Sequence, residues 1–457
     1  MVVALARRSV VEPFLSLAGR NLRQRHWREI ERTQWCSSDE LRAIQQRRLA
    51  DLLRFAYHNN IFYRERFEAV SATPEDIRSS EDLGRIPLLT KSDVRENAAA
   101  LISKGYRRED LLEFRTGGST GKPLSLHITE ECSERRNACA RRHDRWSGWE
   151  VGEPVAAVWG NPQTPRNSRA RFWRWLRGPH LFLDTMEVNE ASVRKFAADW
   201  RRVQPTLLFG HAHSLYLLAR YVAELGLDFV RPRAIVSSSM MLLDVEREVI
   251  ERVFSTRVFN RYGCEEVGLI ASECERHEGM HLNFEHLIVE SIGEDGLPAA
   301  PCQPGRIVVT DLLNLAMPFI RYQVEDEVTL LTSACPCGRG LPLLGKVTGR
   351  LADFLVKPDG SRVAGVSLVE NTLTRVPHVE QMQIIQESIC EIRLRIVPGR
   401  HFGEDERGQL MSYFSRLFGP SVTVFVDLVP NIAPAGSARK FRFCISNVRP
   451  GSGGLDG

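Results

Sequence analysis

The sequence predicts an α/β protein with a large N-terminal domain of mostly parallel, helix-covered sheets, a barrel-like antiparallel subdomain and a small α+β C-terminal domain. Three observations lead to this prediction. Short β-rich runs alternate with helical stretches in the middle of the chain, turn-separated strands follow Glu285, and mixed segments fill the last hundred residues. Such alternation is typical of a parallel sheet, whereas strands joined by turns indicate antiparallel pairing. We place the domains at 1–349 and 350–448, followed by a flexible tail at 449–457.

Each part has its own local pattern. The segment from Ser38 to Glu65 carries apolar residues at helical spacing, which predicts an entry helix. The runs "PVAAVWG", "PTLLFG", "RAIVSSS" and "TRVFNRYG" predict strands, and "EASVRKFAADWRRV", "HSLYLLARYVAELG" and "LDVEREVIERVF" predict the helices between them. Later strands are predicted in "HLIVESI", "GRIVVTDL" and "DEVTLLT". The C-terminal unit is expected to combine "VEQMQIIQESICEIRLRIVPG" and "SVTVFVDLV" around the helix "EDERGQLMSYFSRLF".

Composition excludes several classes of protein. Of 457 residues, 43% are hydrophobic and 26% charged, which is typical of a globular chain with substantial cores. The formal net charge is only +4, so a nucleic-acid-binding role has no support. Charged residues and a proline interrupt the apolar N-terminus, so we expect neither a signal peptide nor a transmembrane span there. We therefore predict a cytoplasmic protein. The ten irregularly spaced cysteines indicate free thiols or a metal site.

The stretch "FRTGGSTGKPLSLHIT", from Phe114 to Thr129, has the composition of an anion-binding loop. A Walker-type phosphate loop is excluded, because it needs a glycine where Thr116 stands and a Ser or Thr where Pro123 stands. Glycines and hydroxyls can nevertheless bring N–H and O–H donors close around an anion. These groups belong to Thr116, Gly117, Gly118, Ser119, Thr120 and Gly121, with Lys122 beside them. The alternative is an ordinary solvated hairpin.

Five segments occur in one order along the chain: "TGGSTGKP", "NRYGCEEVG", "TDLLNLAMPFIRYQVED", "GRLADFLVKPDG" and "SARKFRF". Together they resemble the adenylate-forming ligases, and specifically the phenylacetate-CoA ligase branch with its capsule-biosynthesis and deazaflavin-adenylating relatives. "IFYRERF" and "DLGRIPLLTKSDVREN" extend the resemblance over most of the chain. It implies an enzyme that binds ATP·Mg²⁺ and a carboxylate, forms an acyl-adenylate and passes the acyl group to a thiol.

The resemblance also implies roles for individual residues. The loop from Thr116 to Lys122 would hold the β- and γ-phosphates before pyrophosphate leaves. Tyr262 and Gly263 would contact adenine and Glu266 would hold Mg²⁺, although a strand-ending turn with a capping acid is the alternative. On the ribose side, Asp326 would accept from the hydroxyls, supported by Arg350. Lys440 matches the catalytic lysine of a mobile C-terminal domain, with the hinge at Ala352 and Asp353.

The chain departs from the family pattern in four places. Val324-Glu325 replaces the usual Thr-Gly, and Ala352 stands where the hinge aspartate is expected. Met240 replaces a frequent glutamate, and Arg439 replaces the glycine before the catalytic lysine. These departures put nucleotide affinity and the hinge in question without removing the chemistry.

A second group of residues indicates a metal site. Cys335 and Cys337, spaced Cys-x-Cys, can share one ion with Cys274 and His281 in a closed, structural Cys₃His zinc site. Members of this branch carry a similar set. His277 can replace His281 as a ligand on spacing alone, and four metal-free side chains are the alternative to zinc.

We therefore predict an AMP-forming acid–thiol ligase that uses ATP, Mg²⁺ and coenzyme A, with an aromatic or other small carboxylate as substrate. A carrier-protein thiol, an amine or a sugar is the alternative acceptor, and a degenerate nucleotide-binding partner protein is the alternative of another class. Four residues at or near the strand ends are candidates for the substrate pocket: Trp159, Phe209, His211 and Tyr216. We expect most of them to be ordinary core residues. The sequence leaves a homodimer open.

Overall fold

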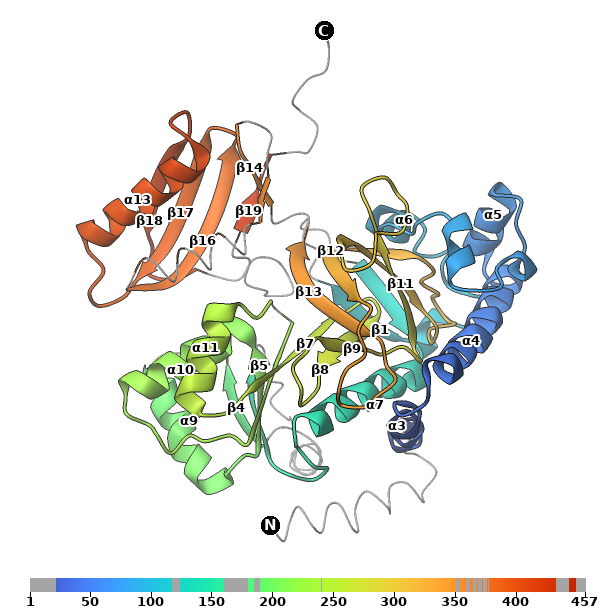
Figure 1. Cartoon of the computed structure of the whole chain (residues 1–457), viewed down its shortest axis with the longest axis horizontal. Helices are drawn as coiled ribbons and strands as arrows, with labels where there is room; N and C mark the ends of the chain where they lie inside the picture. The colour runs from blue at the N-terminus through green and yellow to red at the C-terminus, as the bar shows by residue number, and fades with distance from the viewer. Residues whose placement is uncertain are drawn as a thin grey trace.

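The structure is a computed structural model (Figure 1). It describes residues 22–116, 124–159, 180–184, 190–239, 241–350, 354–358, 362–364, 368, 372, 376, 378–432 and 444–448. Within these residues the predicted α/β fold class is confirmed: a mixed sheet carries helices on its parallel half, and a small α+β unit follows it. The boundary near residue 350 stays a prediction.

Helices open the described chain. They are α3 (Leu22–Thr33), α4 (Ser38–Asn59), α5 (Ile61–Ala69) and α6 (Lys91–Glu96), with short 3-10 turns η2 (Pro74–Asp76), η3 (Glu81–Arg85) and η4 (Arg108–Asp110) among them. The expected entry helix is thus two helices, because Asn60 interrupts it. The backbone of Asn60 is extended, its side-chain oxygen caps α5 at the Tyr63 N–H, and its amide donates to the Leu101 carbonyl at 2.8 Å.

One eleven-stranded sheet forms the centre of the molecule, in the order β10-β11-β12-β13-β9-β8-β7-β6-β5-β3-β4. Its parallel half comprises β3 (Val155–Trp159), β4 (Leu181–Asp184), β5 (Leu207–His211), β6 (Ala234–Ser238) and β7 (Val258–Cys264). Its antiparallel half comprises β8 (Gly268–Glu273), β9 (Met280–Leu282), β10 (Leu287–Ile292), β11 (Pro304–Asp311), β12 (Tyr322–Leu331) and β13 (Leu343–Arg350). The expected antiparallel subdomain is therefore continuous with the parallel sheet, because β7 pairs with both β6 and β8.

Helices α9 (Glu190–Val203), α10 (Ala212–Glu224) and α11 (Asp244–Phe254) lie together beside the parallel strands (Figure 1). Alternate strand residues explain this layer. Leu208 and Ile235 share an apolar cluster with these helices, whereas the neighbouring Leu207 and Val236 belong to a cluster on the opposite face. A separate helix, α7 (Glu130–Trp146), begins at the Thr129 cap and follows the hairpin of β1 (Leu112–Thr116) and β2 (Leu124–Ile128).

The C-terminal unit has its own core. Its sheet runs β18 (Thr423–Leu428), β17 (Glu391–Pro398), β16 (Val379–Ser388) and β19 (Cys444–Ser446), next to the hairpin of β14 (Phe354–Val356) and β15 (Arg362–Ala364). Helix α13 (Glu404–Phe418) packs against this sheet through Leu410, Phe414 and Phe418. The same core takes in Leu243, which precedes α11 in the large domain.

Candidate active site

The Tyr-Gly element lies at the end of β7, where the parallel half of the sheet meets the antiparallel half. Tyr262 and Gly263 lie near the end of this strand, a turn follows, and β8 begins at Gly268. A Cβ on Gly263 would stand 2.6 Å from the Gly268 carbonyl oxygen, so the β7–β8 pairing requires glycine there. This turn presents Glu266 beside the neighbouring antiparallel strands.

Tyr262 and Asp326 are in direct contact. The Tyr262 hydroxyl donates to Asp326 Oδ2 at 2.7 Å, which joins β7 to β12. Asp326 lies directly across from Arg350 in the β12–β13 register, so the backbone brings three predicted nucleotide-binding positions to one place. Only 7% of Asp326 is exposed, and a phenol donor leaves its negative charge in place.

Glu266 is equally buried, with 7% exposed. Its Oε1 accepts a hydrogen bond from the Tyr322 hydroxyl at 3.0 Å, and its backbone carbonyl accepts one from Arg136 at 2.9 Å. Tyr322 and Arg136 are residues that the sequence reasoning missed. Tyr322 stands inside the quoted "RYQVED" segment, which was a usable signal, whereas Arg136 has none because it lies among many arginines of α7.

The two carboxylates also act on a neighbouring thiol. Burial and the charges of Glu266 and Asp326 raise the pKa of the Cys264 thiol well above its ordinary value, so this cysteine is a neutral thiol and no nucleophile. The arrangement of the two carboxylates fits a hard cation at Glu266 and hydroxyl donors at Asp326.

Several predicted residues cannot be placed. Gly117, Gly118, Ser119, Thr120, Gly121 and Lys122 lie outside the described residues, as do Met240, Ala352, Asp353, Arg439 and Lys440. The flanking strands are described, and Thr116 pairs with Leu124 in the β1–β2 hairpin. The loop thus connects two antiparallel strands, and its phosphate-binding role stays a prediction.

Three of the four substrate-pocket candidates meet at the carboxyl ends of β3 and β5. The rings of Trp159 and Phe209 are stacked with centroids 4.8 Å apart, and the ring centroid of His211 lies 3.9 Å from that of Trp159. All three side chains are partly exposed. Tyr216 is different, because it is buried in the apolar cluster of α9, α10 and α11.

The four predicted zinc ligands also meet. The donor atoms of Cys274, His281, Cys335 and Cys337 all lie within 4.8 Å of one another. Sγ of Cys274 is 3.7 Å from Sγ of Cys335, and Sγ of Cys337 is 3.3 Å from Nε2 of His281. Nδ1 of His281 is 3.1 Å from the Leu341 carbonyl oxygen, a contact that orients Nε2 toward the thiols. This donor set fits tetrahedral zinc.

His277 is not part of this group. Its Nδ1 lies 3.1 Å from Glu273 Oε2, and its ring packs against Phe259 with centroids 4.5 Å apart. The geometry therefore selects His281 between the two histidines that spacing left open.

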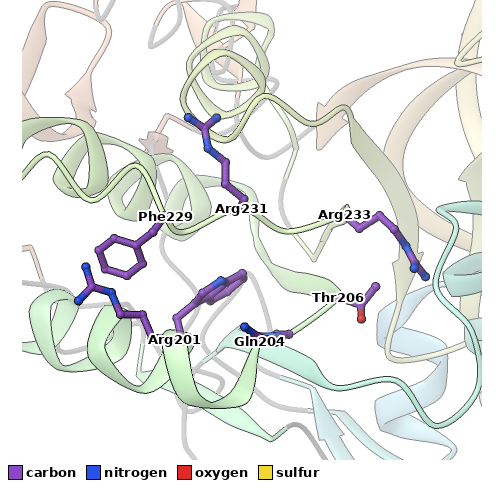
Figure 2. Close-up of a pocket in the computed structure, with 8 residues that line it drawn as sticks. Arg201, Gln204, Thr206, Phe229, Arg231 and Arg233 are labelled. Carbon is purple, nitrogen blue, oxygen red and sulfur yellow. The ribbon is translucent and has the colours of Figure 1, made fainter. Parts of the chain in front are cut away.

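A pocket lies at the amino ends of the parallel strands, opposite the carboxyl ends that carry Trp159, Phe209 and His211. Thr206 and Arg233 line it immediately before β5 and β6 begin. Figure 2 shows its three arginines pointing away from one another. Arg201 lies over the Phe229 ring and Arg233 pairs with Glu153, so the guanidinium groups do not converge on one ligand.

Comparison with known proteins supports the resemblance to the adenylate-forming ligases. Residues 355–447 match the family model of the CapK C-terminal domain. The chain is 23% identical to Protein CapK of Staphylococcus aureus over 93% of both chains, and 26% identical to the phenylacetate-coenzyme A ligase of Escherichia coli over 72% of this chain and 75% of that one.

Solved structures show the same fold. A 2-hydroxyisobutyryl-CoA ligase in its postadenylation state matches 90% of both chains with a TM-score of 0.71 at 19% identity. In its thioesterification state, with an acyl-AMP and CoA, the same ligase matches with a TM-score of 0.60 at 20% identity. The resemblance to the adenylate-forming ligases is confirmed, and the chain is an acyl-CoA ligase-like enzyme related to CapK and to the phenylacetate-CoA ligases.

Proposed function

We propose that this enzyme activates a small carboxylate with ATP·Mg²⁺ and transfers the acyl group to the thiol of coenzyme A. The observation that carries the proposal is the paired arrangement at the end of β7, where Tyr262 contacts Asp326 and Tyr322 contacts Glu266. One pair suits a nucleoside, with a ring beside an acceptor of ribose hydroxyls. The other suits a phosphate-bound cation.

In the first half-reaction, a carboxylate oxygen attacks the α-phosphorus, the bond to the β-phosphate breaks, and pyrophosphate leaves. Tyr262 and Asp326 would orient adenine and ribose. Mg²⁺ held by Glu266 would supply charge compensation for the phosphates. Lys440 would stabilise the negative charge that builds up on the reacting oxygens, and such a contribution is largest where water is excluded.

In the second half-reaction, a thiolate attacks the acyl carbonyl and AMP leaves with the bonding electrons. We propose that the C-terminal domain turns about Ala352 and Asp353, which withdraws Lys440 before the thiol enters. ATP and CoA are cytoplasmic substrates, and we place the enzyme in that compartment.

An aromatic or flat acid is the substrate that we favour. The cluster of Trp159, Phe209 and His211 supports this choice, because it offers ring surfaces at the strand ends where ligands of such sheets bind. A pyrophosphate-release screen of aryl, aliphatic and amino acids would test it. Release with aliphatic acids alone would contradict the aromatic assignment.

A second acceptor class has its own support. The similarity to Protein CapK, whose name specifies no CoA acceptor, covers 93% of both chains, more than that to the phenylacetate-coenzyme A ligase. A sugar, an amine or a carrier-protein thiol is therefore our second candidate for the acceptor. Incubation of the enzyme, ATP and an active acid with and without CoA separates these classes by product mass. A degenerate binding protein, the third candidate, would show no ATP–pyrophosphate exchange with any acid.

We also propose a structural zinc ion at Cys274, His281, Cys335 and Cys337. The closeness of the four donors supports it. A site with four protein ligands leaves no open position for substrate, so this ion would join the β8–β9 region to the segment before β13 without taking part in the reaction.

A further inference from the structure

We propose that Tyr322 and Arg136 are positioning residues that fix Glu266 from two sides, its carboxylate and its backbone, so that its carboxylate meets the phosphate-bound cation. This inference rests on the proposed function for the role of Glu266. It adds two residues that act through Glu266 and do not touch substrate themselves.

Tyr322 holds the carboxylate. It is fully buried, and its ring is stacked on Phe319 with centroids 5.0 Å apart at 23°. Its backbone is held as well, because Leu89 donates to the Arg321 carbonyl and accepts from Gln323, on either side of Tyr322. The hydroxyl that donates to Glu266 Oε1 at 3.0 Å is therefore attached to a ring with little freedom to move.

The chemistry of this donor matters. A phenol orients the carboxylate without neutralising it, whereas an arginine partner would compete with a metal ion for its charge. Among the described residues Glu266 forms no ion pair. One hydrogen bond from Tyr322 to Oε1 leaves lone pairs of the carboxylate for a cation.

Arg136 holds the backbone of the same turn. Its Nη2 donates to the Glu266 carbonyl at 2.9 Å and to Asp311 Oδ2 at 2.7 Å, and its Nη1 donates to the Glu265 carbonyl at 3.3 Å. Asp311 is fully buried and also accepts from a backbone N–H at 2.9 Å, so the guanidinium is held at a fixed point.

The turn is shaped around this arginine. Gly268 has φ +79°, and a Cβ there would stand 2.9 Å from Cδ of Arg136. Both the left-handed backbone and the close approach require glycine. Helix α7 thus supports the turn that carries Glu266, across 130 residues of sequence.

Hydrogen bonds of this kind also stabilise folds, so the test needs a matched structural control. Tyr63 provides it, because it is fully buried in the same apolar cluster and its hydroxyl bonds the Pro318 carbonyl and the Ile320 N–H at 2.9 Å each. Tyr63→Phe removes a buried, hydrogen-bonded phenol hydroxyl, as Tyr322→Phe does, but one without contact to Glu266. For Arg136→Lys the control is Arg135→Lys, whose guanidinium pairs with Glu131 on the same helix.

The experiment measures ATP binding by calorimetry as a function of Mg²⁺ concentration, which requires no knowledge of the acid. We expect wild type to bind ATP more tightly as Mg²⁺ rises. Tyr322→Phe and Arg136→Lys should each need at least fivefold more Mg²⁺ for half of that gain, since a hydrogen bond to a charged group is worth about tenfold or more. Tyr63→Phe and Arg135→Lys should stay within twofold of wild type.

Two results would overturn the inference: a wild type whose ATP affinity is independent of Mg²⁺, or Tyr322→Phe and Arg136→Lys variants whose Mg²⁺ requirement matches that of their controls. Thermal melting of each variant shows whether any change is only loss of stability, because Tyr63→Phe should lose at least as much. If these binding results are as expected but no acid supports pyrophosphate exchange, the positioning role stands and the proposed ligase function fails.

Discussion

The metal site gives the sharpest test of how this structure is held together. We expect the double change Cys335→Ser with Cys337→Ser to remove zinc and to lower the free energy of unfolding by about 4 kcal/mol. The magnitude follows from the chain that the ion would close: Cys274 and Cys335 are 61 residues apart, and cross-linking a loop of that length is worth about 4 kcal/mol in chain entropy. In a chain of 457 residues such a loss lowers the melting temperature by about 4 °C, because the unfolding entropy grows with chain length.

The assay combines zinc content by mass spectrometry with thermal melting. Wild type, purified without chelator, should carry about one zinc per chain. The matched control is Cys302→Ser with Cys390→Ser, two exposed cysteines outside the cluster, which should keep both the zinc and the melting temperature. Wild type without zinc, or a cluster variant with its full zinc content, would refute the reasoning.

The other predictions concern single side chains. Glu266→Gln should lower the rate of pyrophosphate exchange by about 10²-fold at saturating acid, because it removes the charge that holds Mg²⁺; a rate near wild type at limiting Mg²⁺ would contradict this role. Lys440→Ala should abolish acyl-adenylate formation yet convert supplied acyl-adenylate and CoA to thioester at close to the normal rate; a folded variant that loses both half-reactions would contradict the two-orientation mechanism. Glu285→Gln should lower stability by about 3 to 5 kcal/mol in denaturant titration, because it leaves the fully buried Arg142 without its 2.7 Å partner. Burial alone would raise the pKa of Glu285, but the charge of Arg142 lowers it from 4.5 to about 2, so this pair should stabilise the fold above pH 4.5 and lose that contribution as pH falls toward 2; an unchanged acid-unfolding profile in the variant would refute the linkage.

Most helices and strands could be predicted from the sequence, because the residues that form and end them lie next to one another in the chain. The helix α9 occupies the same residues, 190–203, as the quoted helical run, since its apolar stripe and its ends are written in adjacent residues. The break at Asn60 was missed for the opposite reason. No glycine or proline marks it, and the amide of Asn60 is satisfied by Leu101, some forty residues further along the chain.

At the candidate site too, contacts between residues far apart in the sequence could not be predicted. The resemblance pointed to Tyr262, Glu266 and Asp326. The structure places Tyr262 against Asp326 of β12 and Glu266 in the turn that follows β7. Arg136 had no sequence signal, because only its position in space separates it from the other arginines of α7. Spacing likewise could not choose between His277 and His281, since the choice depends on which ring nitrogen reaches the thiols.

Leu243 connects the core of the C-terminal unit to the parallel part of the large sheet. Leu243 is 3% exposed and belongs to the C-terminal core, yet it lies only five residues after the end of β6 at Ser238. Burying one leucine contributes about 1.5 to 3 kcal/mol, an amount that differential ligand binding can outweigh. In the proposed mechanism, the reorientation that admits the thiol would therefore have to release Leu243, which lies five residues after the end of β6.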